Sequence, residues 1–127
     1  MRVKLDQLDH LVLTVADIER TIDFYTRILG MEKVTFGTRK ALRFGDQQIN
    51  LHQRGHEFEP KAALPTPGSG DLCFITSVPL EQVTRELEGA HVPIELGPVD
   101  RTGANGALRS VYLRDPDGNL LEIANRV

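Results

Sequence analysis

The pattern of apolar and polar residues in the first half of the chain predicts one strand, one helix and three further strands. Leu8–Val15 is rich in β-branched and apolar residues, as strands are. Asp17 is placed to cap a helix, because its carboxylate can accept a backbone N–H, and Gly30 is placed to end it. Between them, apolar residues recur at helical spacing at Ile18, Ile22, Tyr25 and Leu29. The three strand-like segments that follow are Glu32–Phe36, Lys40–Phe44 and Gln47–Gln53.

The second half repeats this order after a polar segment, Arg54–Gly70, whose prolines and glycines predict a linker. Pro79 suits the first position of a helix, where the missing N–H costs nothing. The elements expected here are a strand at Gly70–Ser77, a helix from Pro79 to Gly89, a weak strand at Val92–Glu95, a glycine-bearing loop at Arg101–Ala107, and a hairpin of Leu108–Arg114 and Asn119–Asn125 across the turn Asp115–Gly118.

This internal repeat predicts the fold class, α+β, with two βαβββ modules. We expect one domain over residues 1–127, with module one at about 1–54, a linker at 55–69 and module two at 70–127. A single module of roughly 55–60 residues would leave the concave face of its sheet exposed to water. Pairing the modules into a cupped mixed β-sheet would turn that face into a cavity.

Composition and charge exclude several classes of protein. The 15 Lys and Arg residues against 18 Asp and Glu give a net charge of −3, whereas nucleic-acid binding needs a basic face. No apolar run approaches the roughly 20 residues that cross a bilayer, and the first residues do not resemble a signal segment. The single cysteine, Cys73, suits a reducing cytoplasm, and its apolar neighbours favour a buried structural role over a nucleophilic one.

Four titratable residues fall at related places in the two modules. His10 and Asp71 lie in the first predicted strands, and His52 and Glu122 in the last. A histidine and a glutamate on otherwise apolar strand faces each need a partner, since an unpaired buried charge is costly. One shared divalent ion would satisfy both, and imidazole with carboxylates suits Zn²⁺, Ni²⁺, Mn²⁺ or Fe²⁺. We therefore predict one divalent metal held by His10, His52, Asp71 and Glu122.

Each candidate also has a structural alternative. His10 could be a core histidine bonded to the backbone, Glu122 could pair with Arg114 or Arg126, and Asp71 could cap a turn. Asn50 competes with His52, because aligning INLHQR with LEIANR makes Asn50, not His52, the equivalent of Glu122 in the repeat. Arg101 with Gly103 and Gly106 could bind an anion, although a flexible connector is the simpler interpretation.

Two long segments resemble a known family. LDHLVLTVADIERTIDFYTRILGM is similar to the opening, and YLRDPDGNLLEI to the closing motif, of a vicinal oxygen chelate domain. This superfamily includes glyoxalase I, fosfomycin- and bleomycin-resistance proteins and extradiol dioxygenases. Stretches such as KALRFGDQQINLH and GDLCFIT resemble most the subgroup called glyoxalase domain-containing protein 5-like, or VOC family virulence protein.

The resemblance implies paired βαβββ modules, often in a homodimer, with a metal in the bowl. His10 matches the family's first-strand histidine and Glu122 its last-strand glutamate. Asp71 stands where most metal-binding members have histidine, and Asn50 where glyoxalase I has glutamate. These two departures weaken assignment to glyoxalase I itself and to the dioxygenases.

The preferred hypothesis is therefore a metal-dependent lyase or isomerase, resembling lactoylglutathione lyase, whose small substrate chelates the metal through two adjacent oxygens. Glu122 and Asp71 would be its catalytic residues, moving a proton. The alternatives are a metal-free protein that binds a drug or metabolite, as bleomycin-resistance proteins do, and an Fe(II) extradiol dioxygenase.

Overall fold

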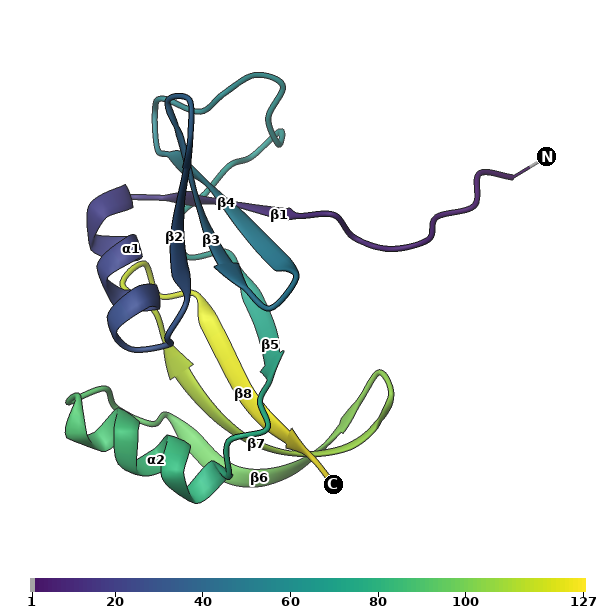
Figure 1. Cartoon of the computed structure of the whole chain (residues 1–127), viewed down its shortest axis with the longest axis vertical. Coiled ribbons are helices and arrows are strands. Elements are labelled where there is room, and N and C mark those ends of the chain that lie inside the picture. The colour runs from purple at the N-terminus through teal and green to yellow at the C-terminus, as the bar shows by residue number, and fades with distance from the viewer. Residues whose placement is uncertain (1) are drawn as a thin grey trace. The chain divides into compact units, whose positions relative to one another are not determined.

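The computed structural model describes residues 2–127 and has two βαβββ modules, each with its own four-stranded mixed sheet and one helix (Figure 1). The chain divides into two compact units between Pro65 and Thr66, within the segment predicted as a linker. The α+β fold class and the repeated module are thus confirmed. The strands of each sheet all come from one module, so there are two sheets, not one continuous sheet.

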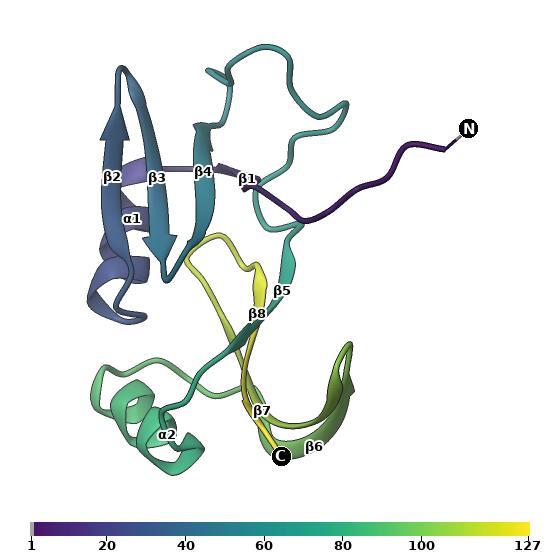
Figure 2. The same cartoon turned by 45° about the vertical axis from the view of Figure 1, so that its right-hand side comes forward.

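The first unit has its parallel strand pair at one side of the sheet. Its elements are β1 (Leu11–Val15), α1 (Ile18–Arg27), β2 (Glu32–Phe36), β3 (Arg39–Phe44) and β4 (Gln47–Gln53). The strand order is β1-β4-β3-β2, as the upper sheet in Figure 2 shows, with β1 parallel to β4 and the other pairs antiparallel. Ile49 and Leu51 are buried, whereas Gln48 and Asn50, which alternate with them, are only partly buried. The sheet therefore has a core face and a second, more polar face.

The second unit repeats this topology. Its elements are β5 (Asp71–Ile75), α2 (Leu80–Gly89), β6 (Leu96–Gly103), β7 (Gly106–Arg114) and β8 (Leu120–Arg126). The order is β5-β8-β7-β6, and β5 is parallel to β8. In β8, Leu121 and Ile123 belong to the buried core, and Glu122 lies between them on the opposite face.

The two helices begin differently. Asp17 caps α1 as predicted, since its carboxylate accepts hydrogen bonds from the backbone N–H groups of Glu19 (3.0 Å) and Arg20 (3.2 Å). Pro79 precedes α2 as its N-cap and is not its first helical residue, which corrects the prediction. Proline has no side-chain acceptor, so the cap of α2 comes from elsewhere in the unit.

That cap is an amide on the last strand, and its counterpart recurs in the first unit. The Asn125 Oδ1 accepts from the backbone N of Leu80 at 2.8 Å, and its Nδ2 donates to the carbonyls of Thr76 and Val78. Gln53 Oε1 likewise accepts from the backbone N of Ile18 at 3.1 Å. Gln53 and Asn125 are therefore equivalent in the repeat, and counting back three residues makes Asn50 the equivalent of Glu122.

The predicted start of the first strand and the predicted position of the sixth strand are wrong. β1 begins at Leu11, so His10 lies immediately before the strand and not within it. Val92–Glu95 is not a strand; the strand is β6, and the segment expected as a loop, Arg101–Ala107, is the end of a β6–β7 hairpin that turns at Ala104 and Asn105. β6 was hard to predict because Gly97 and Pro98 interrupt its pattern beside a register shift, as is tolerated on an edge strand.

Within residues 2–127, no helix combines the length and apolar character that crossing a membrane requires.

Candidate functional site

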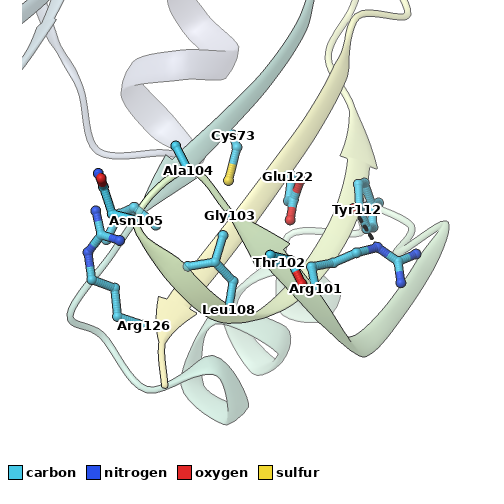
Figure 3. Close-up of a pocket in the computed structure, with 11 residues that line it drawn as sticks. Cys73, Arg101, Thr102, Gly103, Ala104, Asn105, Leu108, Tyr112, Glu122 and Arg126 are labelled. Carbon is cyan, nitrogen blue, oxygen red and sulfur yellow. Dashed lines mark hydrogen bonds between the residues drawn. The ribbon is translucent and has the colours of Figure 1, made fainter.

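Glu122 lies at the centre of a cross-strand row in the second unit. Cys73 on β5 and Tyr112 on β7 are its register partners on either side. Residues directly opposite one another across a sheet point to the same face. A cavity of about 420 Å³ covers this row and is lined by Cys73, Tyr112 and Glu122 among others (Figure 3). The predicted glutamate therefore stands in a cavity built from one module.

The Glu122 carboxylate is fixed by a buried hydroxyl. Ser110 is fully buried, and its Oγ donates to Glu122 Oε2 at 2.6 Å. Glu122 makes no ion pair with Arg114 or Arg126 among the described residues; Arg114 pairs with Glu95, at 3.0 Å from Nε to Oε1. The alternative in which Glu122 pairs with one of these arginines therefore does not hold.

Cys73 is exposed toward the cavity and is not the buried filler that its neighbours predicted. Partial desolvation raises the pKa of its thiol, and the Glu122 carboxylate opposite raises it further, whereas the Arg126 charge acts against both. The thiol is therefore held protonated beside Glu122, as a weak hydrogen-bond donor and not as a nucleophile. Ser110, Cys73 and Tyr112 were missed as site residues because only the strand register reveals that they surround Glu122.

His10 is half-exposed, with 43% of its side chain accessible, and contacts a neighbouring carboxylate. Its Nδ1 lies 2.9 Å from Asp9 Oδ2. A carboxylate on one ring nitrogen orients the imidazole and leaves the other nitrogen available to a ligand. The core-histidine alternative does not hold for His10.

His52 is only 7% exposed, in a small cluster of the first unit. Its ring makes an edge contact with Phe58, centroids 5.6 Å apart, and the guanidinium of Arg39 lies 4.2 Å from the centre of the Phe58 ring. Burial lowers the pKa of His52, the Arg39 charge lowers it further, and Glu57 opposes them. His52 is therefore held neutral under an aromatic cover.

The strand register separates His10 from His52. Thr14 is opposite His52 and Val12 is opposite Asn50. Because His10 precedes Thr14 by four residues, it lies about 13 Å from the His52 end of the strand pair, at about 3.3 Å per residue. Asn50 is about half that distance away by the same count. The register thus favours Asn50 over His52 as the residue nearer to His10.

Asp71 begins β5, is exposed, and lies opposite Leu120. It shares its face with Cys73, two residues further along, so it is on the cavity face although it is not among the lining residues. No three His, Cys, Asp or Glu side chains gather into a possible metal-binding group in residues 2–127.

His10 in the first unit and Glu122 in the second each have the donor chemistry of a ligand to a divalent metal. Metal-bound histidines characteristically donate their second ring nitrogen to a carboxylate, and metal-bound carboxylates are themselves hydrogen-bonded. Asp9 and Ser110 supply these two supports. Imidazole and carboxylate are each ligands of Zn²⁺ and the neighbouring transition metals.

Residues 7–123 match the family model described as Glyoxalase/Bleomycin resistance protein/Dioxygenase superfamily. The chain belongs to this superfamily. Virulence protein STM3117 of Salmonella typhimurium (strain LT2) is 60% identical over 97% of this chain and 86% of its own length. A crystal structure of that protein superposes with a TM-score of 0.96, covering 98% of this chain and 100% of the other.

Glyoxalase domain-containing protein RDO1 of Mycosarcoma maydis is 52% identical over 98% of this chain and 70% of its own length. The superfamily fold extends further, to a lactoylglutathione lyase from Agrobacterium tumefaciens. That structure is 23% identical with a TM-score of 0.72, covering 95% of this chain and 94% of the other, and shares the fold alone. The predicted superfamily and its virulence-protein subgroup are confirmed.

Proposed function

We propose that this chain is a divalent-metal-dependent, glyoxalase-like enzyme of the lyase or isomerase type. Its substrate is a small molecule that binds the metal through two adjacent oxygens. The single observation that carries the proposal is the Glu122 carboxylate, oriented by buried Ser110 inside a cavity. Membership of a superfamily whose members commonly use a divalent metal supports it.

In this proposal His10 and Glu122 bind one Zn²⁺, Ni²⁺, Mn²⁺ or Fe²⁺ ion. The remaining protein ligand comes from Asp71, His52 or Asn50. Bound metal would supply Lewis acidity, polarising a substrate carbonyl. His52 is already neutral, as a ligand must be, but its cover by Phe58 counts against it.

The proton step falls to carboxylates on the cavity face. Asp71 is exposed at the start of β5 and shares that face with Cys73 and Glu122. A carboxylate so placed can take a proton from the carbon beside a carbonyl and return it to the adjacent carbon, which is the net change of an isomerase. Glu122 is the second candidate for this role.

A homodimer and a cytoplasmic location complete the proposal. Leu11 and Val12 on β1 in the first unit, and Ile75 on β5 in the second, are each exposed apolar side chains that a partner chain would cover. The thiol of Cys73 would remain reduced in the cytoplasm. Analytical ultracentrifugation of the purified protein tests the dimer, and a sedimentation coefficient of a 14.2 kDa monomer contradicts it.

Elemental analysis of protein purified without added metal tests the central claim. We expect about one metal ion per chain in the wild type and a loss of most of it in His10→Ala and Glu122→Ala. His56→Ala is the matched control, because His56 is an exposed histidine with no proposed role. Asp71→Asn, His52→Gln and Asn50→Ala, assayed in parallel, identify the remaining ligand.

Each alternative function has its own outcome in this test. Metal content that is unchanged in both alanine variants contradicts the proposal. A wild type without metal that still binds small molecules would be a binding protein. Iron, together with oxygen consumption on catechols, would indicate the dioxygenase.

A further inference from the structure

Two arginines lie in one cross-strand row of the cavity wall, on the same face as Glu122. Arg101 on β6 is opposite Leu108 on β7, and Leu108 is opposite Arg126 on β8. Directly opposed residues share a face, and Arg126 follows Glu122 by an even number of positions along β8. All four residues line the cavity.

Within the described part of the chain, both arginines lack a carboxylate partner. Arg101 donates from Nε to the Tyr112 hydroxyl at 2.9 Å and from Nη1 to the Asp100 carbonyl at 3.1 Å. Among residues 2–127, neither Arg101 nor Arg126 forms an ion pair, whereas Arg27, Arg109 and Arg114 all do. The cavity wall therefore carries two unneutralised positive charges and one carboxylate.

The guanidinium of Arg101 lies beside Tyr112, at the end of the Glu122 row. The Arg101 Cζ lies 5.4 Å from the centre of the Tyr112 ring, and Tyr112 is the register partner of Glu122. Figure 3 shows Arg101 and Arg126 on opposite sides of the cavity, with Cys73 and Glu122 between them. An anion near Glu122 could thus contact either arginine.

We propose that the cavity recognises a substrate with a second anionic group, a carboxylate, that is bound by one of the two arginines, Arg101 or Arg126, while the other end reaches Glu122. The planar guanidinium presents paired N–H donors that match a carboxylate. The substrate class is a short 2-oxo or 2-hydroxy acid with a carboxylate at its far end. This inference rests on the proposed function for the end with two adjacent oxygens.

Calorimetry with two matched compounds tests the proposal. The probes are 2-oxoglutarate, which has the distal carboxylate, and 2-oxopentanoate, which has the same chain length without it. We expect 2-oxoglutarate to bind the wild type about tenfold more tightly, as befits a charge-assisted hydrogen bond. Arg101→Gln or Arg126→Gln should reduce this ratio toward one, and the variant that does so identifies the arginine that binds the carboxylate.

Arg109→Gln is the matched control. Arg109 neighbours Leu108 but points to the other face, where its Nη1 lies 3.2 Å from Asp100 Oδ1, so its loss should leave the ratio unchanged. Equal affinities of the two compounds for the wild type, or no measurable binding of either, overturn the inference. So does a ratio that both the Arg101→Gln and the Arg126→Gln variant retain.

A parallel titration of chelator-treated protein separates this inference from the proposed function. If the wild type proves to contain no metal but still prefers 2-oxoglutarate, the anion site stands and the metal-dependent function fails. If metal is bound by His10 and Glu122 but the preference is missing, the function stands and the anion site fails.

Discussion

At the scale of single residues, the informative side chains are those that hold others in place. Glu122 was recognisable in the sequence, because the closing motif and the repeat both single it out. Ser110 was not, since a serine in an apolar strand carries no signal until the register places its hydroxyl on Glu122. His52 was placed correctly in a strand, but its cover by Phe58 depends on how the following segment folds back. The sequence therefore predicts candidate metal ligands more readily than it predicts the residues that contact them.

Replacing Ser110 with alanine should weaken metal binding more than it weakens the fold. The variant leaves Glu122 Oε2 without its buried donor, and loss of such a support typically reduces metal affinity about 10–100-fold. The free energy of unfolding should fall by about 1 kcal/mol for the lost hydrogen bond. Competition with a chromogenic chelator measures the affinity, and Ser77→Ala, at an exposed serine, is the control. Unchanged affinity in Ser110→Ala would remove Ser110 from the site.

The neutral state of His52 makes stability depend on pH in one direction. Burial lowers its folded pKa below the ordinary value of 6.5, so the unfolded chain binds a proton more readily than the folded one. The stabilisation is present above pH 6.5 and is lost as the pH falls below it, toward the folded pKa. The melting temperature of the wild type should therefore fall more steeply between pH 7 and pH 5 than that of His52→Gln. Parallel slopes in the two proteins would show that His52 contributes nothing.

At the scale of elements, strands with a clear period were predictable and the interrupted strand was not. β2 and β4 were predicted with their observed bounds, and the α1 cap at Asp17 was confirmed. β6 exists because it pairs with β7 across their hairpin, and that pairing overrides a local sequence containing Gly97 and Pro98. The cap of α2 by Asn125 is likewise invisible locally, because the two lie 45 residues apart.

Gly97 lies against the backbone of β7, and a side chain there should loosen the hairpin. A Cβ at Gly97 would lie 2.5 Å from the Ser110 carbonyl oxygen and 3.0 Å from Val111 Cα, at a φ of 115°. Gly37, at a φ of 63°, has open space around it and serves as the control. Both alanine variants incur about 1–2 kcal/mol of backbone strain. Gly97→Ala should lose about 1–3 kcal/mol more through overpacking. Urea unfolding measures both, and equal losses would contradict the close approach.

At the scale of the whole molecule, the two units of the repeat share one fold but differ at a candidate ligand position. Gln53 and Asn125 perform the same structural task in the two units, which makes Asn50 the counterpart of Glu122 and shows that the modules differ at this position. One module offers a carboxylate and the other an amide, so the two sheets are related in fold but not in chemistry. In the proposed function, the second unit alone would therefore supply a carboxylate ligand at this pair of positions.

If His10 and Glu122 bind a metal, stability should depend on that metal. A ligand that binds only the folded state stabilises it, by about 2.7 kcal/mol when its free concentration is 100 times its Kd. Adding a chelator should lower the melting temperature of the wild type, and adding back Zn²⁺ or Ni²⁺ should restore it. Glu122→Ala should melt at the same temperature with and without chelator, whereas His56→Ala should behave as the wild type does, because His56 is an exposed residue outside the proposed site. If the chelator still lowers the melting temperature of Glu122→Ala, the stabilising metal is bound elsewhere. If the wild type contains one metal ion per chain but the chelator does not change its melting temperature, the ion also binds the unfolded chain.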